Sequence, residues 1–123
     1  MTSKKDVAIA FLQQAASGHA REAFERYTTS AFRHHNAYFP GDATSLMIGM
    51  DDNARDNPGK RLEVQRALEE GDLVAVHSRV QHRPDDPGAA VVHVFRFEGE
   101  LIAELWDVGQ PVPAQLVNAN GMF

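Results

Sequence analysis

The hydrophobic period of the chain changes near its middle, and this change constrains the fold more than any other feature. Before the Pro58-Gly59 pair, apolar residues recur every three or four positions, which is typical of amphipathic helices. After this pair, apolar and polar residues alternate, which is typical of strands with one buried face. Helices followed by strands predict a segregated α+β fold.

Three helices are expected in the first half. The first has a capping-box start, because Asp6 follows Ser3 by three positions, and the third begins at an Asp42 cap. The third must end before Pro58, because a residue that precedes proline avoids helical backbone. The helices are expected at residues 3–17, 19–29 and 42–57, with an irregular segment at 30–41.

Four strands are expected in the second half, in the order of a meander. Gly71-Asp72 and Glu98-Gly99 are tight-turn signals, and PDDPG at positions 84–88 is a longer turn. Two late prolines end the sheet pairing. The expected strands are one that includes Leu62 and Val64, followed by 73–83, 90–97 and 101–108. Consecutive strands joined by short turns predict antiparallel pairing.

Composition excludes several classes of protein. The chain has 123 residues and a formal net charge of -5, which fits one domain over residues 1–123. It has 12 basic against 17 acidic residues and no basic block, so neither nucleic acid nor an anionic membrane is an expected partner. The absence of cysteine excludes thiol catalysis and thiolate metal sites. No apolar run approaches the roughly 20 residues that span a bilayer, and we expect a cytoplasmic protein.

Asp107 is the most informative single position, because it follows Trp106 inside a run that is otherwise typical of a buried strand. Desolvation would raise the pKa of a carboxyl group there and suit it to proton transfer. The alternative is a solvated Asp at a strand end. Alternation places Asp107 with Leu101, Ala103, Leu105 and Gly109, and places Ile102, Glu104, Trp106, Val108 and Gln110 on the opposite face. The apolar patch on that opposite face predicts a homodimer through the sheet.

A second candidate group lies in the segment after the second helix. It contains His34, His35, Asn36 and Tyr38. Such side chains can orient a carbonyl group and stabilise an enolate. The alternative is a surface turn, since Asn and His tolerate irregular backbone.

His77 and His93 lie on predicted strands, and the register decides whether they reach the cavity of Asp107. Either could instead be a core histidine with one hydrogen bond. No H-x-H or H-E-x-x-H spacing is present, so no metal site is expected. Met47 suits both the core and an adaptable pocket wall.

Four blocks of the sequence form a recognisable pattern: GDLVAVHS at 71–78, VFRFEGELIAELWDVGQPVP at 94–113, the closing NGMF, and HHN at 34–36. The pattern resembles the SnoaL-like polyketide cyclase family of the nuclear-transport-factor-two-like superfamily, which also holds ketosteroid isomerase and scytalone dehydratase. The resemblance implies a cone-shaped barrel, in which three N-terminal helices pack in a strongly curved antiparallel sheet that leaves a deep pocket at its open end.

The resemblance also implies roles for single residues. Asp107 would be the acid/base of an intramolecular aldol condensation that needs neither metal nor organic cofactor. His35 and Asn36 would lie near the carbonyl oxygens of a small apolar or carbonyl-bearing substrate, and His77 would be a pocket histidine.

Two positions depart from the family pattern. His93 stands where an acid is expected and Leu105 where a histidine is expected, so the substrate or reaction would differ if both face the pocket. The expected catalytic residues are Asp107 and His35. The expected substrate-binding residues are Asn36, Tyr38, His77, His93, Met47 and Leu105.

Three functions remain open from the sequence. The first is a cofactor-independent enzyme of cyclase, isomerase or lyase type. The second is a non-catalytic protein that holds a small apolar ligand in the same cone, because fold does not determine function. The third is an interaction domain whose pocket is filled by Phe and Met side chains.

Overall fold

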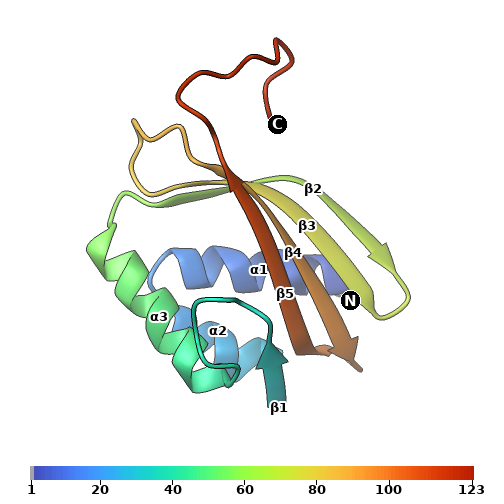
Figure 1. Ribbon diagram of the computed structural model, residues 1–123. Helices are drawn as coiled ribbons and strands as arrows, with labels where there is room; N and C mark the ends of the chain where they lie inside the picture. The colour runs from blue at the N-terminus through green and yellow to red at the C-terminus, as the bar shows by residue number, and fades with distance from the viewer. Residues whose placement is uncertain (1) are drawn as a thin grey trace.

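The computed structural model describes residues 2–123 and confirms the α+β class. The five strands form one sheet in the order β1-β5-β4-β3-β2, and the three helices lie on one side of it (Figure 1). In chain order the elements are α1 (Lys4–Ala16), α2 (Ala20–Tyr27), β1 (Thr28–His34), α3 (Ala43–Asp56), β2 (Arg61–Glu70), β3 (Leu73–Gln81), β4 (Ala89–Glu98) and β5 (Leu101–Pro111).

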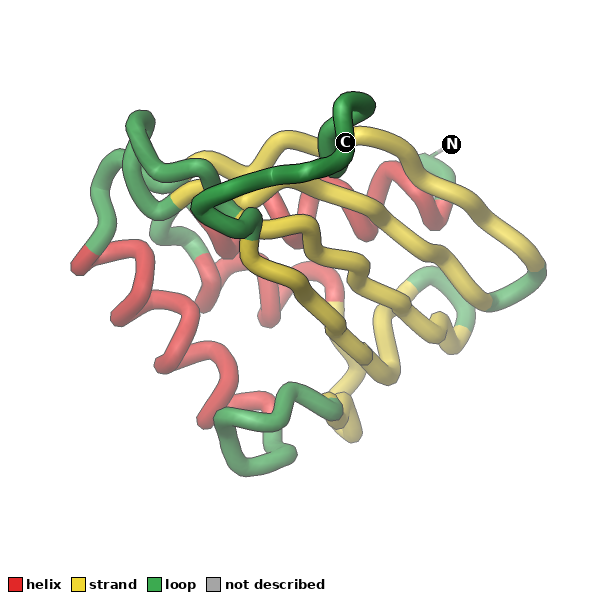
Figure 2. Tube along the Cα trace, turned by 45° about the horizontal axis from the view of Figure 1, so that its top comes forward, coloured by secondary structure: helices red, strands yellow, loops and turns green. Residues whose placement is uncertain are grey.

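The sheet is strongly curved, as expected, and it is open and mixed instead of purely antiparallel. β1 pairs with β5 in parallel, whereas the pairs β2-β3, β3-β4 and β4-β5 are antiparallel. The edge strands β1 and β2 do not pair with each other. Figure 2 shows how the sheet nevertheless curls, with its concave face towards the helices.

The helix starts follow the predicted caps. Ser3 Oγ accepts a hydrogen bond from the Asp6 backbone N–H at 3.1 Å, and the Asp6 carboxylate accepts one from the Ser3 N–H at 3.4 Å. Asp42 caps α3 by accepting from the Ser45 N–H at 2.9 Å. Among residues 2–123, no helix has the length and apolar composition that crossing a bilayer would require.

The strand β1 was not predicted. The second helix ends at Tyr27 instead of Thr29, and the first part of the expected irregular segment pairs with β5. Two residues of β1, Phe32 and His34, are each 5% exposed and face the helices. The local sequence lacks a clear apolar alternation, because the pairing partner of β1 lies about 70 positions later in the chain and only the tertiary fold supplies it.

The core occupies one end of the concave face and leaves the other end for a cavity. Phe11 of α1 packs edge-to-face against Phe24 and Phe95, with ring centroids 5.1 Å and 6.0 Å apart. Further along the same face of β4 and β5, the inward residues become His93 and Asp107, which are directly paired across the two strands. The sheet therefore carries polar side chains to the point where the core ends.

A bulge in β5 changes the predicted faces of that strand. Phe95 pairs with Leu105, but Phe97 pairs with Ile102, so Ala103 is an extra residue on β5. Leu105 still shares the concave face with the site, as alternation predicts. Ile102 turns inward and is fully buried, whereas alternation placed it outside beside Trp106. Ile102 therefore does not join Trp106 in an outer apolar patch, and the homodimer stays a prediction.

Candidate functional site

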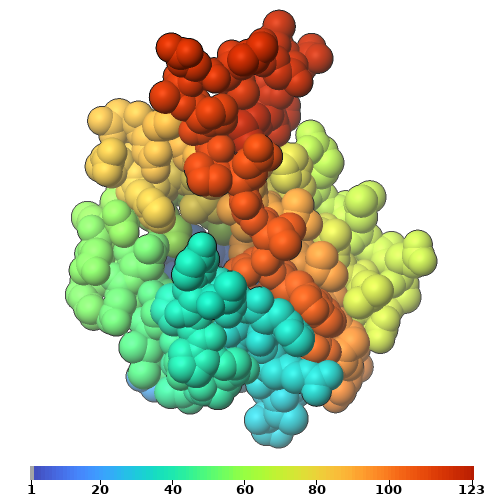
Figure 3. Space-filling view, viewed as in Figure 1, coloured from blue at the N-terminus to red at the C-terminus, as the bar shows by residue number. Residues whose placement is uncertain are grey.

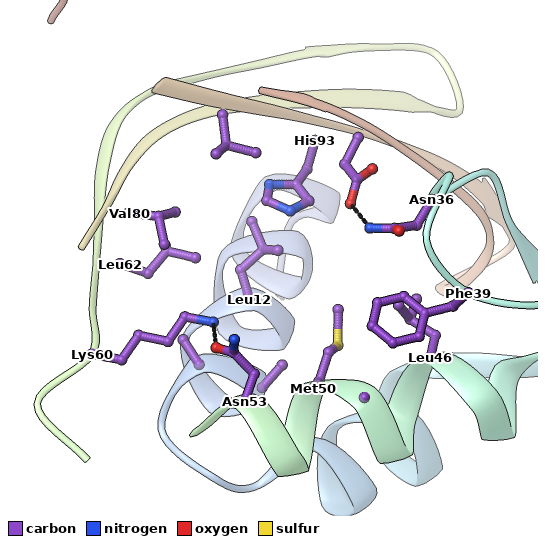
Figure 4. A pocket seen from close by; sticks show the side chains of 15 residues that line it. Leu12, Asn36, Phe39, Leu46, Met50, Asn53, Lys60, Leu62, Val80 and His93 are labelled. Atoms are coloured by element: carbon purple, nitrogen blue, oxygen red, sulfur yellow. Dashed lines mark hydrogen bonds between the residues drawn. The ribbon is translucent and has the colours of Figure 1, made fainter. Parts of the chain in front are cut away.

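A cavity of about 220 Å³ lies between the concave face of the sheet, α1 and α3. In the space-filling view it opens as a hollow beside α3 and the loop that follows β1 (Figure 3). Figure 4 shows apolar side chains from helix and sheet converging on it. These include Leu12, Leu46, Met50, Leu62, Val80 and Val91, and the polar lining residues are Asn36, Asn53, Lys60, His93 and Asp107.

Asp107 reaches the cavity from β5 as a half-buried side chain. Its Oδ2 accepts a hydrogen bond from Asn36 Nδ2 at 2.8 Å, drawn as a dashed line in Figure 4. Within the described chain no second hydrogen bond reaches this carboxylate. Its other oxygen, Oδ1, is therefore free to accept a proton from a bound molecule.

The loop after β1 fixes the orientation of Asn36. Its backbone N–H donates to His34 Nδ1 at 3.1 Å, and the opposite ring nitrogen of His34 contacts the Pro40 carbonyl oxygen at 2.7 Å. These two partners require that the hydrogen of His34 be on Nε2. Asn36 Oδ1 accepts from the Tyr38 backbone N–H at 2.9 Å, which leaves Nδ2 to donate to Asp107.

His93 is the cross-strand neighbour of Asp107 and is 7% exposed. Burial lowers its pKa from 6.5 to about 4; the Asp107 carboxylate opposes this shift and the Lys60 ammonium adds to it. His93 is therefore neutral at pH 7 and can donate one hydrogen bond. Its Nδ1 is buried and has no hydrogen-bond partner among residues 2–123.

Lys60 and Asn53 line the cavity across from Asn36 (Figure 4). Lys60 Nζ donates to Asn53 Oδ1 at 2.7 Å, and burial lowers the pKa of Lys60. Neither residue was predicted from the sequence. A signal existed for Asn53, because it follows Leu46 by seven positions and Met50 by three and so shares their helix face. Lys60 gave no such signal, because a lysine that follows a Pro-Gly turn is typical of a charged residue on the surface.

His35 lies outside the cavity, contrary to the expectation that it lines the pocket. Its Nε2 contacts Glu104 Oε2 at 2.6 Å on the convex face of the sheet, and its ring stacks on Trp106 with centroids 5.0 Å apart. Arg33 and Arg96 also donate to Glu104, at 2.9 Å and 3.0 Å. Hydrogen bonds from Arg33, His35 and Arg96 lower the pKa of Glu104 to about 2, although burial opposes them.

His77 also lies on the convex face, because its neighbours Val76 and Ser78 are the inward residues of β3. Its ring stacks on Phe123 near the end of the chain, with centroids 6.4 Å apart. The sequence pattern had left the register open, and the structure separates His77 from Asp107. Of the two strand histidines, His93 alone lines the cavity.

Three other expected pocket residues also lie elsewhere. The Tyr38 side chain points to solvent and is 90% exposed, so only its backbone supports the site. Met47 and Leu105 are buried in the core beside the cavity, at 9% and 2% exposure. Met50, one helical turn from Met47, lines the cavity instead.

The polar groups around Asp107 suit proton transfer. In the described chain, no group of three or more His, Asp or Glu side chains is placed to hold a metal ion. What the cavity offers is a carboxylate with one free oxygen, next to a neutral imidazole, within mainly apolar walls. In such surroundings a hydrogen bond to a developing negative charge is stronger than in water.

Solved structures share the fold at low sequence identity. A provisionally assigned isomerase of the SnoaL-like family from Agrobacterium tumefaciens is 13% identical, with a TM-score of 0.70 over 87% of this chain and 97% of that one. A provisionally assigned polyketide cyclase from Sinorhizobium meliloti is 13% identical, with a TM-score of 0.67 over 84% of this chain and 94% of that one. An uncharacterised cystatin-fold protein from Novosphingobium aromaticivorans is 17% identical, with a TM-score of 0.72 over 88% and 99%.

These likenesses support the fold alone, and no curated protein matches the sequence. A sequence profile described as a SnoaL-like domain matches residues 8–105, which is most of the chain. The match includes Asn36, Lys60 and His93 and stops two positions before Asp107. The chain therefore belongs to the SnoaL-like domain family.

Proposed function

We propose that this protein is a cofactor-independent acid/base enzyme that acts on a small carbonyl compound, with Asp107 as the proton-transfer group. The observation that carries the proposal is the Asp107 carboxylate in an apolar cavity, with one hydrogen bond from Asn36 and the neutral His93 beside it. Isomerisation and aldol-type ring closure of a carbonyl compound can both begin with one step, removal of a proton from the carbon next to the carbonyl group.

In the proposed step, Asp107 Oδ1 takes a proton from the carbon next to the substrate carbonyl. The electron pair of the broken C–H bond moves into a carbon–carbon double bond, and the carbonyl oxygen becomes an enolate oxygen. The N–H of neutral His93 donates a hydrogen bond to that oxygen, which stabilises the charge as it develops. Asn36 holds the carboxylate in one orientation throughout.

The protonated Asp107 then returns its proton. In an isomerisation, the proton goes to a different carbon of the same molecule. In an aldol reaction, the enolate carbon first forms a bond to a second carbonyl carbon, and the proton goes to the alkoxide oxygen that results. Both reactions return Asp107 to its ionised starting state, so neither reaction needs an external oxidant or reductant.

His93 takes the role that the sequence had suggested for His35 or His77. Those two side chains lie on the convex face, so neither can contact a molecule beside Asp107. His93 is paired with Asp107 across β4 and β5. The departure from the family pattern at this position therefore supplies the hydrogen-bond donor in the proposed mechanism.

Solvent deuterium exchange tests the proposal. We expect the protein to speed the exchange of protons next to the ketone of methyl levulinate, or of its homologues with longer methylene chains, in D₂O. A placed acid/base contributes about 10²–10⁴-fold, so Asp107→Asn should lower the exchange rate by at least about 10²-fold while ester binding persists. Proton NMR measures both. Ester binding with exchange no faster than in buffer would favour the non-catalytic binding protein and contradict the proposal.

A further inference from the structure

A second polar group lies at the end of the cavity opposite Asn36. Lys60 reaches it from the residue before β2, and Asn53 reaches it from α3 (Figure 4). The two side chains are joined by the 2.7 Å hydrogen bond from Lys60 Nζ to Asn53 Oδ1. The proposed proton transfer does not use either residue.

Lys60 is half-buried and differs from Arg96 in its partners. Arg96 pairs with Glu104 and Glu98, whereas Lys60 makes no ion pair within the described chain. An ammonium has three N–H donors, and the bond to Asn53 uses one of them. Asn53 Nδ2 donates to no group among residues 2–123. The lining of the mainly apolar cavity therefore includes two adjacent side chains that have unused donors.

We propose that Lys60 and Asn53 form a carboxylate-binding subsite, so that the substrate is a small oxo acid. This inference rests on the proposed function: the ketone end lies at Asp107 and His93, and the carboxylate lies at Lys60. A carboxylate presents two oxygens to two neighbouring donors, and its single charge matches one ammonium. A phosphate dianion would add a second negative charge to a cavity that already holds Asp107.

The walls between the two ends fit the middle of such a molecule. Leu12, Met50, Leu62 and Val80 line this part of the cavity and favour methylene groups. The cavity volume of about 220 Å³ suits a short chain. The charges at both ends act on His93, because the Lys60 ammonium lowers its pKa and the Asp107 carboxylate raises it.

The test compares acids with their methyl esters as ligands. Levulinate and its homologues with longer methylene chains are titrated into the protein, and dissociation constants are measured by NMR or calorimetry. We expect at least one acid to bind at least about tenfold more tightly than its ester, since a hydrogen bond to a charged group is stronger than one between neutral groups. Lys60→Met should remove this difference, and Lys60→Arg should keep most of it.

Lys5→Met is the matched control, because Lys5 is exposed and does not line the cavity. It should leave the preference for acids unchanged. The subsite proposal would be overturned if the wild-type protein bound every acid and its ester with equal affinity. It would also be overturned if folded Lys60→Met still preferred acids to esters. The comparison of ligands on the wild-type protein keeps the test decisive even if a variant does not fold.

Asp107→Asn separates this inference from the proposed function. The subsite predicts that this variant keeps the Lys60-dependent preference for acids, although it no longer exchanges protons. If the preference is present but wild-type protein exchanges no ketone proton, the subsite holds and the proposed chemistry fails. If the protein exchanges the ketone protons of esters but binds acids no more tightly than esters, the proposed proton transfer holds and the carboxylate subsite fails.

Discussion

Two carboxylates three positions apart on β5 lie in opposite environments. Glu104, on the convex face, accepts hydrogen bonds from Arg33, His35 and Arg96, and its side chain is 6% exposed. Asp107, on the concave face, accepts one hydrogen bond from Asn36. The comparison shows that burial alone does not identify a reactive acid. The carboxylate whose lone pairs are all engaged suits a structural role, and the one with a free oxygen suits chemistry.

The His34-His35-Asn36 segment serves both carboxylates. His34 holds the loop through the Asn36 N–H and the Pro40 carbonyl. The next two side chains point to opposite faces of the sheet, because successive residues of extended chain alternate in direction. His35 therefore reaches Glu104, and Asn36 reaches Asp107. One short motif orients a structural carboxylate and a candidate catalytic one.

We expect the largest change in stability from His93, the buried neutral neighbour of Asp107. Its pKa is 6.5 in the unfolded chain and about 4 in the folded protein. Between pH 6.5 and pH 4 the unfolded state binds more protons than the folded state. The free energy of unfolding therefore decreases as pH falls, by about 1.4 kcal/mol per pH unit and by up to about 3 kcal/mol in total. His93→Gln should lose this decrease. Urea unfolding from pH 7 to pH 4 measures it, and parallel curves for both proteins would contradict the burial of a neutral His93.

A smaller effect is expected from removing the one hydrogen bond to Asp107. Asn36→Ala should lower the exchange rate by about tenfold, because a hydrogen bond to a charged group contributes about 1.5–3 kcal/mol and part of its loss is made up by water. Ligand affinity should change little. Tyr38→Ala is the matched variant in the same loop, since its exposed ring does not line the cavity. Equal rates in the two variants would show that Asn36 does not orient the base.

The smallest effect on exchange is expected at Glu104. Glu104→Gln should leave the exchange rate unchanged but lower Tm at pH 7, because Arg33 and Arg96 lose a charged partner. The low pKa of Glu104 means that its stabilisation is present above about pH 4.5 and disappears as pH falls towards 2, so the Tm difference should shrink there. Glu98→Gln removes an exposed partner of Arg96 and serves as the control. The same Tm for both variants would refute the structural role of Glu104.

Local patterns predicted much of the fold. The capping box at Ser3, the Asp42 cap and the turns around Gly71 and Gly99 depend on neighbouring residues, and the structure has helix ends and turns at these points. Alternation also placed Asp107 on the concave face, because no bulge lies between Leu105 and Asp107. These features are set by interactions within a few residues along the chain.

Other features depend on distant parts of the chain and could not be predicted. β1 forms only because β5 pairs with it, and the bulge at Ala103 depends on the register with β4. The separation of His35 from Asn36 requires knowing which face of the sheet each residue meets. Lys60 follows a turn as a surface charge would, and the curl of the sheet brings it to the cavity.

Deuterium exchange by two matched variants distinguishes the roles of Asp107 and Glu104. Asp107→Asn and Glu104→Gln each replace one acid of β5 with its amide, and both are assayed in D₂O with the same ketone substrate as the wild-type protein. We expect a loss of at least about 10²-fold for Asp107→Asn and a wild-type rate for folded Glu104→Gln. A wild-type rate for Asp107→Asn, or equal losses in both variants, would show that Asp107 is not the proton-transfer group.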